Sequence, residues 1–144
     1  MVSVPVELVS VEDTWARLAS DPEAVLIDVR TVAEWSFVGV PDLSTIGKRP
    51  VLVEWQTFPS NQVNASFADQ VEDALKALSV SRNAELLFLC RSGARSLRAA
   101  ETMAAVGYAR CRNVVDGFEG PLGPDRHRGA LSGWKAKGLP WVQG

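Results

Sequence analysis

Two short apolar segments constrain the fold of this chain most strongly. Residues 24–29 (AVLIDV) and 85–90 (ELLFLC) are almost continuously apolar, and each is short enough to be a single strand. Such runs are typical of strands that are covered on both faces, as in a parallel sheet. Because strand patterns alternate with amphipathic helical patterns along the chain, we expect an α/β fold with helices on both faces of a parallel sheet.

The other elements are predicted from local signals. Further strands are expected at 5–10, 50–55 and 111–117. A loop rich in glycine and proline is expected at 120–133. Helices are expected at 11–19 after Ser10, at 32–37 after Thr31, at 65–78 after Asn64, from about Ser96 to Gly107, and at 133–141.

Length and composition define the class of protein. A chain of 144 residues has the size of one domain, which we expect to cover residues 1–144. An apolar content of 47% and a charged content of 22% are ordinary for a globular domain that folds in water. No apolar run approaches the roughly 18 residues that would span a membrane, and no basic segment precedes an apolar stretch at the start. We therefore expect a cytoplasmic protein without a membrane partner.

The charged residues are unevenly distributed along the chain. The formal net charge is −2, which argues against nucleic acid as a partner. Residues 1–81 carry 5 basic and 12 acidic residues, whereas residues 82–144 carry 10 basic and 5 acidic residues. The arginine-rich second part is either an ordinary solvated surface or part of a site for small anions, and the residues around Cys90 favour the anion site.

The segment CRSGARS, which follows the second apolar run, carries the reactive chemistry. Ligands of parallel α/β sheets bind beyond the carboxyl ends of the strands, and Cys90 occupies that position here. A tight loop of small residues directs backbone N–H groups inward, and a following helix adds the positive end of its dipole. These groups favour the thiolate, the nucleophilic form of a cysteine. The residues expected to surround the anion are Arg91, Ser92, Gly93, Ala94, Arg95 and Ser96.

A second pair of candidate residues, Asp28 and Arg30, ends the first apolar run. We expect this strand to lie beside the strand that ends at Cys90. A supporting role is favoured, in which Asp28 accepts N–H groups of the loop and Arg30 pairs with Glu34 four residues further on. Direct participation in the chemistry is the alternative.

Five stretches, taken in order, resemble the single-domain rhodanese family. They are LIDVRTVAEW, LLFLCRSGARS, AAETMAAVGY, NVVDGFEG and GWKAKGLPW, and together they extend from about residue 7 to 143. The resemblance implies the rhodanese fold, a five-stranded parallel sheet flanked by helices. It also implies thiosulfate sulfurtransferase activity, with Cys90 as the nucleophile and residues 91–95 as the loop that holds the anion.

In the reaction that the resemblance implies, Cys90 attacks the outer sulfur of thiosulfate, releases sulfite and becomes a persulfide. A thiophilic acceptor, such as cyanide or a small-molecule or protein thiol, then takes the sulfur. The expected partners are therefore a small anionic sulfur donor and a thiol acceptor. Two arginines in the loop suit a doubly charged donor, which favours thiosulfate.

The chain departs from the family in two places. Gly39-Val40-Pro41-Asp42-Leu43 stands where members often carry Gly-His-Ile-Pro-Gly-Ala, a motif that we interpret as structural. The chain also lacks the inactive second half of two-domain rhodaneses, so we expect an open site that admits protein acceptors.

Two other functions remain as alternatives. A phosphatase or arsenate reductase of the same fold would need a loop one residue longer, because the arginine follows the cysteine by five positions here and Ser96 occupies the sixth. A non-catalytic rhodanese-like binding module is the second alternative, although such modules usually lose the cysteine that this chain keeps.

The remaining candidates have less support. Cys111 opens a strand, so we expect it in the core, about 15 Å from Cys90, and not as a resolving thiol. His127, the single histidine, is expected at the surface, and the chain has no cluster with zinc spacing. We expect neither a metal nor a cofactor. Trp35 and Trp55 follow strand ends and are candidates to line the pocket, whereas Trp15 and Trp134 are expected on amphipathic helices.

Overall fold

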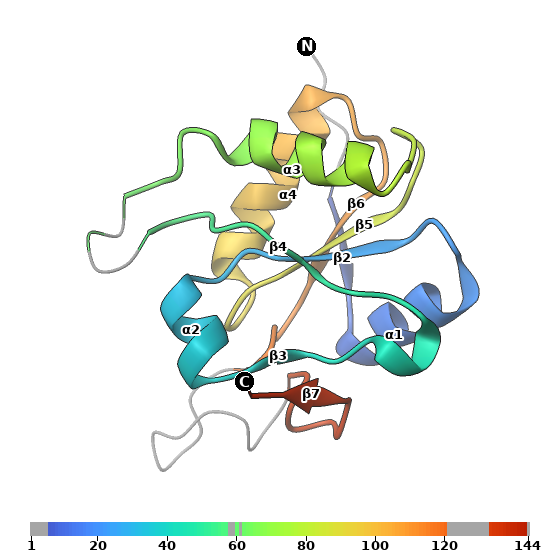
Figure 1. Cartoon of the computed structure of the whole chain (residues 1–144), viewed down its shortest axis with the longest axis vertical. Coiled ribbons are helices and arrows are strands. Elements are labelled where there is room, and N and C mark those ends of the chain that lie inside the picture. The colour runs from blue at the N-terminus through green and yellow to red at the C-terminus, as the bar shows by residue number, and fades with distance from the viewer. Residues whose placement is uncertain (1–5, 58–59, 61, 121–132, 144) are drawn as a thin grey trace.

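The structure, a computed structural model, is built around a parallel sheet with helices on both of its faces (Figure 1). It describes residues 6–57, 60, 62–120 and 133–143. The sheet has five strands in the order β1-β6-β5-β2-β4, and every pairing between neighbours is parallel. The predicted five-stranded parallel sheet is therefore confirmed. The strands are β1 (Glu7–Val9), β2 (Val25–Asp28), β4 (Val51–Leu52), β5 (Leu86–Leu89) and β6 (Cys111–Val114).

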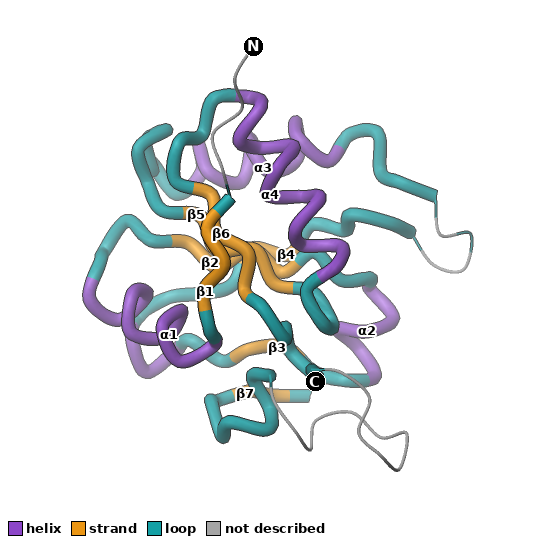
Figure 2. Tube along the Cα trace, turned by 180° about the vertical axis from the view of Figure 1, so that it is seen from behind, coloured by secondary structure: helices purple, strands orange, loops and turns teal. Residues whose placement is uncertain are grey.

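Three helices cover the sheet. Helices α3 and α4 lie on one face and α1 lies on the other, as the front and back views show (Figure 1, Figure 2). The short helix α2 follows β2 directly and lies beyond the carboxyl end of the sheet. The helices are α1 (Val11–Ser20), α2 (Val32–Phe37), α3 (Phe67–Ala77) and α4 (Ala94–Val106), with a 3₁₀ turn at Ser44–Ile46.

The two central strands are buried on both faces, as their continuous apolar runs predict. All four residues of β2 and all four of β5 are buried. Ile27 and Phe88 pack with α3 and α4, whereas Leu26 and Leu87 pack with α1 on the opposite face. Each such side chain stabilises the fold by roughly 1.5–3 kcal/mol relative to its exposed state. In this register Asp28 lies opposite Leu89, so both strands end side by side, next to Cys90.

A second, two-stranded sheet was not predicted. β3 (Val40–Pro41) pairs antiparallel with β7 (Trp141–Val142) at the carboxyl side of the main sheet. The helix expected at 133–141 is wrong, because residues 133–138 form turns in which Gly133 and Gly138 have positive φ angles, which are incompatible with a helix. Trp134 is nonetheless fully buried, and its indole N–H donates to the carbonyl of Pro140 (2.6 Å).

Three element boundaries also differ from the predictions. α3 begins at Phe67 after Ser66, because Asn64 Oδ1 accepts the N–H of Ser66 (3.0 Å) in a turn before the helix. The Nδ2 of Asn64 donates to the carbonyl of Glu54 (2.9 Å) and the side chain of Gln70 (2.8 Å). The strand expected at 50–55 is only the two residues of β4. α4 begins two residues earlier than expected, because Gly93 turns the chain at a positive φ of 108°. Arg95 and Ser96 therefore belong to the first turn of α4.

Asp28 and Arg30 form a fully buried ion pair at the end of β2. Arg30 donates from Nε and Nη2 to the carboxylate (2.6–3.1 Å) and from Nη2 to the carbonyl of Gly39 (2.7 Å). Asp28 also accepts the backbone N–H of Arg30 (3.1 Å). The expected pairing of Arg30 with Glu34 is wrong, because Asp28, two residues away, holds the guanidinium and Glu34 faces elsewhere.

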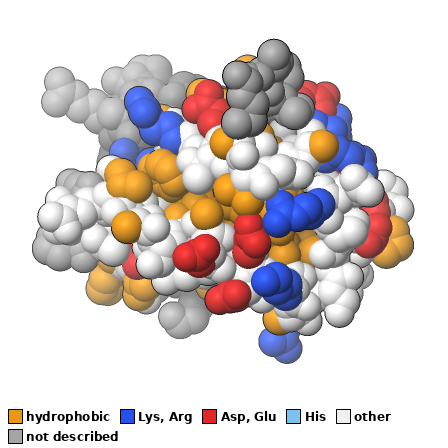
Figure 3. All heavy atoms as spheres, turned by 90° about the horizontal axis from the view of Figure 1, so that it is seen from above, with side chains coloured by type: hydrophobic (Ala, Val, Ile, Leu, Met, Phe, Trp, Pro, Cys, Tyr) orange, Lys and Arg blue, Asp and Glu red, His pale blue; other side chains and the backbone are white. Residues whose placement is uncertain are grey.

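Residues of opposite charge that are far apart in the sequence come together in the fold. Arg112 donates from Nε to Glu85 (2.9 Å) and forms an ion pair with Glu7 (2.9 Å), and Arg17 joins the same cluster. On the face shown in Figure 3, acidic and basic side chains lie close to one another around apolar side chains. The arginines of the second half thus pair in part with the carboxylates of the first half. None of the helices in the described part of the chain is long and apolar enough to cross a membrane.

The buried pair generates a prediction for stability. Asp28→Ala leaves a buried guanidinium without its counter-ion, so we expect the free energy of unfolding to fall by about 3–5 kcal/mol. Glu12→Ala removes a carboxylate from an exposed pair with Lys137 (3.9 Å) and should cost less than about 1 kcal/mol. Chemical denaturation of both variants measures the difference. An unchanged stability together with lost activity would instead give Asp28 a part in the chemistry.

Candidate active site

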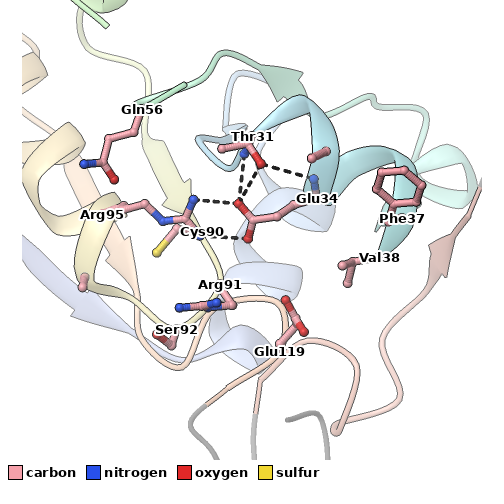
Figure 4. Close-up of a pocket in the computed structure, with 12 residues that line it drawn as sticks. Thr31, Glu34, Phe37, Val38, Gln56, Cys90, Arg91, Ser92, Arg95 and Glu119 are labelled. Atoms are coloured by element: carbon pink, nitrogen blue, oxygen red, sulfur yellow. Dashed lines mark hydrogen bonds and ion pairs between the residues drawn. The ribbon is translucent and has the colours of Figure 1, made fainter. Parts of the chain in front are cut away.

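Cys90 lies directly after β5, at the floor of a pocket beyond the carboxyl end of the sheet (Figure 4). Its side chain is 1% exposed, so only a small part of the sulfur faces the pocket. The loop that follows makes a tight turn and enters α4 at Ala94. Of the candidate residues in this loop, Arg91, Ser92, Ala94 and Arg95 line the pocket with Cys90, whereas Gly93 and Ser96 are not among its described lining residues.

The sulfur of Cys90 accepts the backbone N–H of Gly93 (3.1 Å). Ser96 lies behind the sulfur, with its Oγ 3.3 Å from Sγ, and is fully buried. Asn113 on β6 donates from Nδ2 to the carbonyl of Gly93 (3.1 Å), so its Oδ1 faces Ser96 Oγ at 2.6 Å and accepts the hydroxyl proton. Asn113, which the sequence analysis did not single out, thereby positions both Gly93 and Ser96.

The backbone of the loop is held by the segment that follows β6. The carbonyl of Cys90 accepts the N–H of Phe118 (2.8 Å), and the carbonyl of Arg91 accepts those of Glu119 (3.0 Å) and Gly120 (3.1 Å). Gly117 makes this approach possible, because a Cβ there would overlap the backbone of Cys90 and Arg91. The sequence contained a signal for this contact in the stretch NVVDGFEG.

Arg95 does not point freely into the pocket. Its guanidinium forms two hydrogen bonds with the carboxylate of Glu34 on α2 (2.7 and 2.9 Å), as Figure 4 shows. Burial by itself raises the pKa of Glu34, but the hydrogen bonds and charge of Arg95 outweigh it and lower this pKa to about 2. The same carboxylate accepts the N–H and hydroxyl of Thr31 (both 3.1 Å), which completes the cap of α2. Sequence analysis missed this role of Glu34 by assigning it to Arg30.

The pocket has a volume of about 780 Å³. Its floor is formed by Cys90 and its loop neighbours, and α2 with its cap forms the facing wall (Figure 4). The predicted residues that line it are Cys90, Arg91, Ser92, Ala94 and Arg95, and the lining residues that were not predicted are Thr31, Ala33, Glu34, Phe37, Val38, Gln56 and Glu119.

Other candidates lie away from the pocket. Trp35 and Trp55 are not among the described residues that line it, and Trp55 packs edge to face on Phe67 (5.1 Å between centroids). Cys111 is buried at the opposite end of the sheet, as predicted, and burial raises its pKa to about 12. His127 lies outside the described residues. Within the described residues, no three or more His, Cys, Asp or Glu side chains are grouped so that they could hold a metal ion.

Comparisons with known proteins identify a matching family and several similar proteins. The family model described as the STR4 middle domain matches residues 6–144. The crystal structure of Rv0390 from M. tuberculosis is 45% identical, has a TM-score of 0.86, and covers 96% of this chain and 98% of that one. An uncharacterized protein of Rickettsia rickettsii is 39% identical over 124 residues, which are 86% of this chain and 87% of the relative.

Two further similarities concern proteins whose names describe a domain or an activity. Thiosulfate sulfurtransferase 18 of Arabidopsis thaliana is 32% identical to this chain, and the match covers 78% of this chain and 76% of the relative. The solution structure of a rhodanese-like domain from Anabaena has a TM-score of 0.60 at 13% identity, over 96% of this chain and 80% of that one. The second similarity shows a shared fold alone.

The contact at Gly117 predicts a steric cost of adding a side chain. Gly117 and Gly47 both have positive φ angles (61° and 71°), and Ala at such a position costs about 1–2 kcal/mol. A Cβ at Gly47 meets nothing within 4 Å, whereas one at Gly117 would overlap the loop backbone. We expect Gly117→Ala to lose more stability than Gly47→Ala in chemical denaturation, and to change the alkylation rate of Cys90. Equal effects of the two variants would show that the close approach does not hold the loop.

The ion pair between Glu34 and Arg95 predicts a dependence of stability on pH. Since the pKa of Glu34 is about 2 in the folded protein and near 4.5 otherwise, the unfolded chain binds the proton more readily between these values. The contribution of the pair is therefore complete above pH 4.5 and lost as the pH falls towards 2. Both side chains are about one-fifth exposed, so we expect about 1–2 kcal/mol after solvent screening.

Unfolding of the wild type and of Glu34→Gln between pH 7 and pH 2 measures this contribution. The wild type should be more stable at neutral pH, and the difference should shrink as the pH approaches 2. A difference that is independent of pH would mean that the charge of Glu34 does not stabilise the fold.

Proposed function

The chain belongs to the STR4 middle domain family and has a rhodanese-like fold, and we propose that it is a sulfurtransferase that carries sulfane sulfur on Cys90. The donor is thiosulfate or a related compound, and the acceptor is a thiophile such as cyanide or a small-molecule or protein thiol. One observation carries the proposal: a reactive residue type, cysteine, lies at the floor of an open pocket with a backbone N–H directed at its sulfur.

The proposed reaction has two displacement steps. The thiolate of Cys90 attacks the outer sulfur of the donor, and the S–S bond of the donor breaks as the new S–S bond forms. With thiosulfate, sulfite leaves with the electron pair of the broken bond. The acceptor then attacks the outer sulfur of the persulfide, and Cys90 leaves as the thiolate, so the protein is restored without an oxidant or reductant.

The geometry supports both steps. The N–H of Gly93 and the amino end of α4 face the sulfur, where they stabilise negative charge. The loop is fixed by backbone hydrogen bonds to Phe118 and Glu119, so these donors need no rearrangement during the reaction. Arg91 follows the nucleophile and lines the pocket, where it can contact the incoming donor.

The proposal predicts a persulfide that intact-mass spectrometry can detect. After incubation with a sulfane donor, the wild type should gain the mass of one sulfur atom and lose it on addition of cyanide. Cys90→Ser should show no gain, because a serine hydroxyl cannot hold the sulfur. Cys111→Ser is the matched control and should behave as the wild type, because Cys111 lies at the opposite end of the sheet from the pocket and burial raises its pKa.

The result also separates the alternatives. A sulfur gain that persists in Cys90→Ser would contradict the assignment of Cys90. A wild type that takes no sulfur from either thiosulfate or an organic persulfide, and whose Cys90 is alkylated slowly, would instead indicate a binding module.

A further inference from the structure

The charges around Cys90 are balanced. Among the described residues that line the pocket, two are basic, Arg91 and Arg95, and two are acidic, Glu34 and Glu119. The carboxylate of Glu34 neutralises the charge of Arg95, in an ion pair with two short hydrogen bonds. Two arginines alone would suit a doubly charged donor, but the carboxylates of Glu34 and Glu119 offset their charge.

The size and the wall of the pocket also differ from what a small dianion requires. A volume of about 780 Å³ is within the range of roughly 300–1,000 Å³ that holds drug-sized organic ligands. The wall that faces Cys90 and Arg95 is α2 with its cap, where the apolar Phe37 and Val38 lie beyond the polar Thr31 and Glu34 (Figure 4). Phe37 is 78% exposed, so an apolar ring faces solvent at the entrance.

From these observations we infer that the pocket selects organic persulfides and thiols, with a low charge and an apolar group beside the reacting sulfur, over the thiosulfate dianion. Glu34 determines this specificity by neutralising Arg95, and Phe37 contacts the apolar group. The inference rests on the proposed sulfur transfer through Cys90 and defines its substrate class.

The corresponding step is balanced without a further reactant. The Cys90 thiolate attacks the terminal sulfur of R–S–SH, and a new S–S bond forms while the S–S bond of the donor breaks. The organic thiolate R–S⁻ leaves with the electron pair, and the terminal sulfur keeps its proton on the Cys90 persulfide.

The charge of the pocket can be measured without any sulfur donor. Iodoacetate and iodoacetamide alkylate the same sulfur but differ by one negative charge. The rate with iodoacetate divided by the rate with iodoacetamide is measured at Cys90 and then divided by the same ratio for a small free thiol. The resulting value reports the local electrostatic potential. We expect a value within about threefold of unity in the wild type and an increase of about five- to tenfold in Glu34→Gln, which leaves the charge of Arg95 uncompensated.

A matched control removes the same charge nearby. Glu54 accepts the backbone N–H of Val32 at the start of α2 (2.9 Å) and is not part of the described pocket lining. Glu54→Gln should change the ratio less than Glu34→Gln. A wild-type ratio that favours iodoacetate by more than about tenfold would show a cationic pocket and overturn the inference, as would equal effects of the two variants.

The apolar wall is tested with a second pair of reagents, N-benzyliodoacetamide and iodoacetamide. Relative to a free thiol, the benzyl reagent should be favoured by the wild type and lose this advantage in Phe37→Ala. Because Phe37 is largely exposed, we expect this variant to fold normally. No advantage in the wild type would contradict the proposed apolar contact.

Sulfur transfer itself is followed separately by intact mass. Persulfide formation from an organic persulfide should exceed that from thiosulfate in the wild type, and Glu34→Gln should improve the use of thiosulfate. Loading by neither donor would contradict the proposed function, whereas loading from thiosulfate alone would contradict only the substrate class.

Discussion

The guanidinium of Arg30 connects the segments on which the candidate site depends. It is fully buried, binds the carboxylate of Asp28 at the end of β2, and donates to the carbonyl of Gly39 where the chain turns after α2. Its Cζ lies 4.2 Å above the ring of Phe118, whose backbone N–H in turn holds the carbonyl of Cys90. One cation thus joins β2, the turn into β3 and the Cys90 loop. Because a buried charge is tolerated only with its partners, these segments hold their positions together.

The order of the elements could be predicted from sequence because it follows local rules. A continuous apolar run predicts a strand covered on both faces, and Ser10 and Thr31 begin helices by accepting N–H groups of the first turn, as the structure confirms. The errors occur where a distant partner overrides the local signal. Asn64 donates to the carbonyl of Glu54 and accepts the N–H of Ser66 in a turn that precedes α3, and the segment after Gly133 pairs with residues about 100 positions earlier in the chain.

The same distinction applies to the candidate site. The loop from Cys90 to Ser96 is contiguous, so the sequence shows its small residues, its arginines and its strand-to-helix position together. The roles of Glu34 and Asn113 were missed, because their partners in this loop are distant in the sequence. Glu34 is 61 positions from Arg95, and Asn113 is 20 positions from Gly93. A spacing of four residues favoured Arg30 as the partner of Glu34. In the structure Arg30 binds Asp28, and Glu34 binds Arg95.

The site therefore consists of two parts with different physical origins. The floor, with Cys90 and Arg91, is fixed by backbone hydrogen bonds to the segment after β6, and such contacts change little when side chains change. The facing wall is α2, a six-residue helix with no fully buried residue, which is held by its cap and by the ion pair of Glu34. Substitutions on α2 can alter charge and shape without disturbing the core. In the sulfur transfer that we propose, the floor supplies the reacting thiol, and the wall is where selection among sulfur compounds would act.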